Sequence, residues 1–309
     1  MRDLLSSSWL IIPFAALFPG LSVGEPLNLK EVAQGIFVHQ GIHELPNQNN
    51  HDEIANIGFV IGSSCVAVID SGGSPNQGKA LKSAISEKTA VPICYVINTH
   101  VHPDHILGNI AFKSPSVKFV GHWKLRDAMA ARAPYYLNSL SRETGTQLNA
   151  QDFVPPDIEI KDQIELWLGD RTLIVRAHPT AHTNNDLTIF DPKTLTLWLS
   201  DLLFMGHLPV VDGSLNGWLN VIEELRKVDA LIAIPGHGPV SVNWPLGLLA
   251  EETYLKMLQT EIRAAIKTGK TIEQAQETIG LSARGDWKLF NELHKRNITT
   301  SFAELEWED

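Results

Sequence analysis

Four side chains that commonly bind metal ions occur within six residues, in the segment His100-Val-His-Pro-Asp-His105. Zinc favours imidazole nitrogen and carboxylate oxygen as ligands. The segment follows a strand-like apolar run at residues 93–97, and a tight turn after a strand can point alternate side chains to different sides of one pocket. The spacing therefore predicts two metal ions on one loop, with His100 and His102 toward one ion and Asp104 and His105 toward the other. The alternative is a polar loop in which histidines cluster by coincidence.

Three later residues could complete such a site. His182 precedes a predicted strand, Asp201 follows an apolar run at residues 196–199, and His237 stands in Pro-Gly-His-Gly-Pro, where glycines let an imidazole approach a crowded site. Taken singly, a loop histidine is commonly a surface residue, and an aspartate after a strand commonly caps a helix. Their order behind the first motif instead favours one metal centre that all seven side chains share.

The chain around these residues alternates predicted strands with helical stretches, which is typical of an α/β layered domain. Strands are expected at residues 35–39, 58–61, 65–69, 93–97, 158–160, 164–168, 172–177, 187–190, 196–199 and 230–234, and helices at 75–87, 122–132 and 216–227. Residues 134–157 are polar and turn-rich, and we interpret them as an excursion. Apolar residues near helical spacing begin at residue 246. We therefore predict a catalytic domain at residues 25–240 and a helical C-terminal region, residues 241–309, packed onto it.

Composition limits the class of protein. Apolar residues make up 44% of the 309 residues and charged residues 19%, which suits a globular domain with a sizeable core. The formal net charge is −10 and no Lys/Arg-rich run occurs, so nucleic acid and anionic lipid surfaces are not expected partners. The sequence also lacks a G-x-S-x-G elbow, so a serine nucleophile is not expected.

Residues 1–24 have the pattern of an export signal. Arg2 precedes an apolar stretch at residues 9–18, and the small residues Ser22 and Gly24 mark a cleavage site. The stretch is shorter than the roughly 20 residues of a membrane span. We predict a periplasmic or secreted mature chain without a membrane span; the alternative is an uncleaved amphipathic N-terminus. An oxidising compartment would permit a Cys65–Cys94 disulfide, and two buried small hydrophobes are the other interpretation.

Together these motifs resemble the metallo-β-lactamase superfamily, over about residues 30–240. The resemblance implies a four-layer αββα sandwich with the metal site at one edge of its two sheets. It also implies two zinc ions as cofactors: His100, His102 and His182 for the first, Asp104, His105 and His237 for the second, and Asp201 as a bridge. Asp70 matches an aspartate that orients the site without binding metal.

Within the superfamily, Asp201 makes the ligand set resemble glyoxalase-type thioesterases more than lactamases. Four longer stretches are similar to the exported quinoprotein relay system zinc metallohydrolases, which occur with pyrroloquinoline-quinone-dependent oxidations: residues 54–58, 102–109, 207–214 and 302–308. The resemblance therefore raises a protein of that system as a partner.

These features predict an exported hydrolase that uses a hydroxide between two zinc ions on an acyl, ester, thioester or amide bond of a small molecule. Asp104 could orient the hydroxide or relay a proton to the leaving group. Three alternatives stay open: a class B β-lactamase, an iron-dependent sulfur oxygenase, and a non-enzymatic exported accessory protein that binds metal or a quinone-linked partner. Around the site, His43 and His51 belong to a loop that could cover it, and Tyr135 and Tyr136 could line a pocket or pack in the core.

Overall fold

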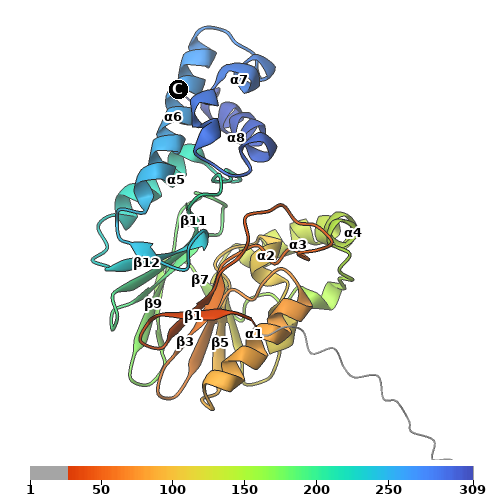
Figure 1. Cartoon of the computed structure of the whole chain (residues 1–309), viewed down its shortest axis with the longest axis vertical. Coiled ribbons are helices and arrows are strands. Elements are labelled where there is room, and N and C mark those ends of the chain that lie inside the picture. Colours follow the sequence, from red (N-terminus) through yellow and green to blue (C-terminus); the bar gives the residue numbers. More distant parts are fainter. Residues whose placement is uncertain (1–26, 309) are drawn as a thin grey trace, which may run out of the picture.

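The computed structural model describes residues 27–308 and folds them around two β-sheets (Figure 1). The first sheet has seven strands in chain order: β1 (Leu29–Ala33), β2 (Ile36–His39), β3 (Ile57–Ile61), β4 (Val66–Ile69), β5 (Ile93–Ile97), β6 (Lys118–His122) and β7 (Ile158–Ile160). The second has six, in the spatial order β13 (Val242–Asn243), β12 (Ile232–His237), β11 (Thr196–Phe204), β10 (Leu187–Asp191), β9 (Thr172–Ala177) and β8 (Gln163–Trp167). The predicted export signal at residues 1–24 lies outside the described residues.

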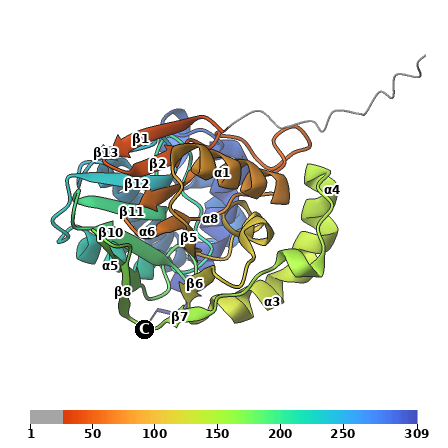
Figure 2. The same cartoon turned by 90° about the horizontal axis from the view of Figure 1, so that it is seen from below.

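Helices cover the outer faces of both sheets, so the fold has four layers (Figures 1 and 2). The helices are α1 (Pro75–Lys88), α2 (Pro103–Ile106), α3 (Leu125–Tyr135), α4 (Ser141–Thr144), α5 (Leu215–Leu225), α6 (Leu248–Lys267), α7 (Ile272–Thr278) and α8 (Phe290–Leu305). Helix α1 packs on the first sheet, and α5, α6 and α8 pack on the side of β11. The predicted αββα sandwich is confirmed.

Strand β4 shows how the sequence builds these layers. Val66 and Val68 pack outward in the cluster that contains Leu81 of α1, whereas Ala67 and Ile69 pack between the sheets. Successive side chains of a strand point to opposite faces, so a continuous apolar run is what a strand buried on both faces requires. Helix α1 begins where the Ser74 side chain accepts a hydrogen bond from the backbone N–H of Gln77 at 3.0 Å.

Parallel pairing brings the functional loops to one edge. Strands β4 to β7 run parallel, and β11 runs parallel to β12. Parallel neighbours end at the same edge of a sheet, so the loops that follow β4 and β5 lie side by side, and the ends of β11 and β12 meet in the other sheet. The chain thereby assembles one site from segments far apart in sequence.

The sequence did not predict three of the strands or the helical segments within residues 134–157. Strands β1 and β13 are short edge strands, and β6 ends within residues expected to be helical. The excursion at residues 134–157 contains a π-helix (Tyr136–Leu140), α4 and a 3₁₀ helix (Ala150–Asp152). Strand β11 also continues to Phe204, so Asp201 lies inside the strand and not after its end. The strand passes through an irregularity at Ser200, which has a left-handed φ of 48° at a register shift, and continues through the buried residues Leu202, Leu203 and Phe204.

The C-terminal helices share a hydrophobic core with β11 and α5. In α8, Glu304 accepts hydrogen bonds from the Leu215 N–H and the Ser214 hydroxyl, both at 2.6 Å, at the start of α5. The predicted domain boundary at residue 240 stays a prediction. Within residues 27–308, the helices include none with the length and apolar character needed to cross a bilayer.

Cys65 and Cys94 form a disulfide, with Cα atoms 5.7 Å apart. Cys65 immediately precedes β4, and Cys94 lies in its parallel neighbour β5. Strand register therefore brings together two residues that the sequence alone left open as a disulfide or as separate buried side chains.

Candidate metal centre

All seven predicted ligand residues converge at one edge of the sandwich. His100 and His102 lie in the loop after β5, and Asp104 and His105 lie in α2. The other three come from the second sheet: His182 from the loop before β10, Asp201 from β11 and His237 from the end of β12.

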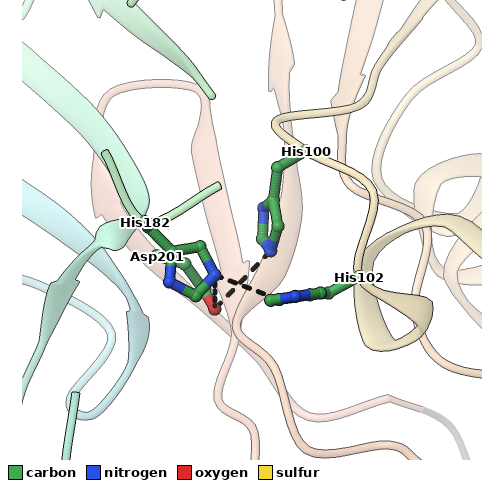
Figure 3. A group of neighbouring side chains, drawn as sticks. All are labelled: His100, His102, His182 and Asp201. Atoms are coloured by element: carbon green, nitrogen blue, oxygen red, sulfur yellow. Dashed lines mark hydrogen bonds and ion pairs between the residues drawn. The ribbon is translucent and has the colours of Figure 1, made fainter. Parts of the chain in front are cut away.

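The first group consists of His100, His102, His182 and Asp201, and their donor atoms lie within 4.8 Å of one another (Figure 3). The Oδ2 atom of Asp201 lies 3.3 Å from His182 Nε2 and 3.6 Å from His100 Nε2. The Nδ1 atom of His102 lies 3.0 Å from His182 Nε2. Four nitrogen and oxygen donors therefore face one point.

The second group consists of Asp104, His105 and His237, again with donor atoms within 4.8 Å of one another. The Oδ2 atom of Asp104 lies 3.4 Å from both His105 Nε2 and His237 Nε2. Asp201 also reaches this group, because its Oδ1 lies 3.1 Å from His105 Nε2 and its Oδ2 lies 3.5 Å from His237 Nε2. The carboxylate of Asp201 thus contacts both groups.

Three nitrogen and oxygen atoms of the two groups are buried without a hydrogen bond to any residue that the structure describes. His100 Nε2, His105 Nε2 and Asp201 Oδ1 are buried and have no hydrogen-bond partner within residues 27–308. Buried polar atoms are normally paired, so nitrogen and oxygen atoms that face one another without a hydrogen bond are suited to a cation placed between them. Imidazole and carboxylate donors are suited to zinc and similar divalent ions. The side chains therefore fit bound metal ions.

The opposite ring nitrogen of each histidine is fixed by a neighbour. His105 Nδ1 lies 2.8 Å from the Asp70 carboxylate, and Asp70 also accepts hydrogen bonds from the N–H and hydroxyl of Thr99, both at 2.8 Å. His182 Nδ1 and His237 Nδ1 lie 2.7 Å and 3.1 Å from backbone carbonyl oxygens. A proton held on Nδ1 leaves Nε2 with its lone pair free for a metal ion.

Asp212 is a site residue that the sequence analysis missed. Its Oδ2 lies 3.0 Å from His102 Nε2, and its carboxylate also pairs with Arg132 of α3 and Arg296 of α8. The bond at Nε2 leaves Nδ1 of His102 as the free donor that faces His182. Asp212 lies within residues 207–214, a stretch noted for its family resemblance, but nothing in its local spacing marks a partner of His102.

Burial and neighbouring charges favour the metal-binding forms of His100, His182 and Asp201, whereas nearby carboxylates raise the pKa of His105 and His237 and favour their protonated forms. Burial lowers the pKa of His182 to about 3, and burial and His105 keep the pKa of His100 well below its ordinary value. Burial alone would raise the pKa of Asp201, but the neighbouring histidines, led by His105, hold it well below its usual range. Burial opposes a proton on His237 as well, yet Asp201 and Asp104 raise its pKa to about 9. A metal ion that binds here displaces that proton.

A cavity of about 540 Å³ opens onto both groups. His102, Asp104, His182, Asp201 and His237 form its inner wall. The outer wall comes from three other segments: Glu44, Leu45 and Pro46 before β3, Arg132, Tyr135 and Tyr136 of α3 and the π-helix, and Leu293 and Arg296 of α8. The C-terminal region therefore contributes to the cavity.

The aromatic and histidine residues noted in the sequence take different positions. Tyr135 is 54% exposed on the cavity wall, whereas Tyr136 is buried and donates a hydrogen bond to the Val101 carbonyl at 3.1 Å. His51 lies 2.8 Å from the Thr144 carbonyl, away from the cavity lining. The His43 ring packs edge-on to His207 at 6.0 Å. The loop thus borders the cavity through Glu44, Leu45, Pro46 and Asp52 rather than through either histidine.

Comparisons with known proteins agree with this architecture. Among curated proteins, the linear primary-alkylsulfatase of Pseudomonas sp. (strain ATCC 19151) is 23% identical over 211 residues, covering 56% of this chain and 40% of that protein. Among solved structures, the stereoselective inverting sec-alkylsulfatase from Pseudomonas sp. has a TM-score of 0.72 at 16% identity, covering 91% of this chain and 51% of the other. The chain thus spans about half or less of these alkylsulfatases.

A metallo-beta-lactamase from Pontibacter korlensis has a TM-score of 0.59 at 19% identity, covering 74% of this chain and 99% of its own. At such identities the likeness to solved structures establishes the fold alone. The sequence model of the Metallo-beta-lactamase superfamily, however, matches residues 52–237, a range that holds all seven converging side chains. The chain belongs to the Metallo-beta-lactamase superfamily.

Proposed function

We propose that the chain is a metal-dependent hydrolase that binds two zinc ions and splits an ester or thioester bond of a small molecule. The observation that carries the proposal is the position of the Asp201 carboxylate, 3.3 Å from His182 Nε2 in one donor group and 3.1 Å from His105 Nε2 in the other. A shared carboxylate offsets the repulsion between two dications held close together.

The proposed ligands are His100, His102 and His182 for the first ion, Asp104, His105 and His237 for the second, and Asp201 for both. Bound zinc ions would supply Lewis-acid chemistry, which polarises a carbonyl group and lowers the pKa of a water to about 7. Asp104 lines the cavity and, in this proposal, also orients the attacking water. Leu45, Val210 and Leu293 add apolar surface that suits the apolar part of an ester.

A sulfate ester is the second candidate substrate. Arg132 and Arg296 line the cavity, and a guanidinium group binds oxyanions through paired N–H donors. Both share one carboxylate, Asp212, so the three side chains keep one net positive charge at the cavity wall. The alkylsulfatase relatives also favour this class. A β-lactam is the weaker alternative, because lactamases of the superfamily generally lack the carboxylate that Asp201 supplies.

We also propose that the protein is exported and works beside a quinoprotein oxidation system. The apolar stretch and small-residue pattern of residues 1–24 support export, and so does the Cys65–Cys94 disulfide, since disulfides persist in oxidising compartments. The link to a quinoprotein system rests on the sequence stretches named above.

A substrate panel on the zinc-loaded protein tests the proposed activity. It should contain a carboxylic ester and a thioester with the same acyl group, an alkyl sulfate, and the lactam nitrocefin. We expect turnover of the ester or thioester that stops on chelation and returns with added zinc. Turnover of the alkyl sulfate alone would select the second candidate. No turnover of any substrate by protein with full metal content would instead favour a non-enzymatic metal-binding role.

A further inference from the structure

Asp52 is a buried carboxylate in the cavity at the metal centre, and it is neither a proposed metal ligand nor a proposed partner of one. Its residue is 1% exposed, and it lines the same cavity as Asp104, His182 and His237. Neither of its carboxylate oxygens has a hydrogen-bond partner within residues 27–308. A buried carboxylate without a partner is costly, so its presence beside a second carboxylate needs a chemical reason.

The backbone around Asp52 is held in an unusual conformation. His51 and Asp52 have φ angles of 49° and 67°, in the left-handed region that non-glycine residues rarely adopt. The Asp52 N–H donates to the Asn50 side chain at 3.1 Å, and His51 Nδ1 lies 2.8 Å from the Thr144 carbonyl. A Cβ at Gly73 would overlap the Asp52 carbonyl, so the loop packs tightly there. These contacts fix the residue in place despite the strain.

Burial favours the protonated form of Asp52. Burial raises the pKa of its carboxyl well above the ordinary value, and the neighbouring Asp104 raises it further against the opposing effect of His105 and His237. The carboxylate of Asp104 lies 3.4 Å from Nε2 of both histidines, so it is already engaged. Asp104 is thus engaged by two histidines, whereas both oxygens of Asp52 lack a hydrogen-bond partner among the described residues and could carry a proton for transfer.

We propose that Asp52 is a further catalytic residue, the acid that protonates the leaving oxygen of the substrate. The inference rests on the proposed ester hydrolysis. As the oxygen of water forms its bond to the carbonyl carbon, the bond from that carbon to the leaving oxygen breaks. The leaving oxygen keeps the electron pair and takes the proton from the Asp52 carboxyl, which releases an alcohol. The proton given up by the attacking water then restores the Asp52 carboxyl.

The variant Asp52→Asn tests this role with little change in shape. Asparagine tolerates the left-handed conformation as well as aspartate does, so the loop should keep its backbone. It cannot donate a carboxyl proton. The two substrates should be esters of one acyl group, one with 4-nitrophenol, whose anion is a weak base, and one with a simple alcohol, whose anion is a strong base and needs protonation.

We expect Asp52→Asn to lower kcat/KM on the alkyl ester by at least about 100-fold, and on the 4-nitrophenyl ester by less than about tenfold. Zinc content by mass spectrometry and the thermal unfolding midpoint should stay at wild-type values. Glu53→Gln is the matched control, because it removes a charge from the same loop outside the cavity lining and keeps an oxygen to accept from Ser74. Glu53→Gln should leave kcat/KM unchanged on both esters.

Equal losses on both esters, no loss on either, or loss of a zinc ion from Asp52→Asn would overturn the role of Asp52. An unfolded Asp52→Asn variant would overturn it as well if Asp52→Ser folds, keeps both zinc ions and retains wild-type activity on the alkyl ester. A wild-type protein that splits neither ester would be a failure of the proposed function instead. The two failures are therefore distinguishable.

Discussion

The Asp212 carboxylate lies 3.0 Å from Nε2 of His102, and it comes from a position 110 residues later in the chain. Arg132 and Arg296 hold the same carboxylate from α3 and α8. Asp212 therefore determines which nitrogen of His102 faces His182. The contact connects the C-terminal helix α8 to the metal centre through a single side chain.

Asp212→Ala should weaken zinc binding at the first site by about 10- to 100-fold, the usual effect of losing a residue that orients a metal-binding histidine. Competition with a chelator measures both sites separately. The second site should keep its affinity, because its histidines are fixed by Asp70 and by the Ile54 carbonyl. Asp229→Ala on the surface is the control. Unchanged affinity in Asp212→Ala would refute the orienting role.

His178 predicts a pH dependence of stability. Its Nε2 lies 2.8 Å from Thr188 Oγ1, and burial, followed by Arg176 and His122, lowers its pKa from 6.5 to about 4. Between these values the unfolded chain binds a proton that the folded chain excludes, so the free energy of unfolding falls as the pH falls through this window. His178→Gln should remove roughly 2.4 kcal/mol of the decrease in the free energy of unfolding between about pH 7 and about pH 4.5.

Urea denaturation of chelated wild type and variant at both pH values measures that difference. The quantity to compare is the decrease in the free energy of unfolding between the two pH values in each protein, because the substitution itself also changes stability at every pH. Equal losses in the two proteins would show that His178 does not titrate as its burial predicts.

Arg171 and Asp191 form a buried ion pair, with 3.3 Å between Nη1 and Oδ2 and side chains that are 2% and 3% exposed. Arg171→Met would leave the Asp191 carboxylate buried without its cation, which should lower the free energy of unfolding by about 3–5 kcal/mol. Lys227→Met breaks an exposed pair with Glu224 and should change stability little. A similar small effect from Arg171→Met would show that Asp191 finds another partner.

The clustering of the first four candidate ligands could be predicted from the sequence, because these residues follow one strand within six positions. His182, Asp201 and His237 were added through their order in the chain, although β11 continues past Asp201, which the apolar run at residues 196–199 does not reveal. Asp52 and Asp212 were not found, because each gains its role only from strands and helices that fold back onto it.

The most direct test of the central claim is the zinc content of wild type and Asp201→Asn, purified without chelator and measured by mass spectrometry with Asp229→Asn as control. We predict about two zinc ions per wild-type chain and per control chain. Because Asp201→Asn keeps the shape and removes the charge shared by both donor groups, we predict loss of the second ion and a drop in ester turnover of at least about 100-fold. Two tightly held zinc ions and full turnover in Asp201→Asn, or a single iron in the wild type, would contradict the account.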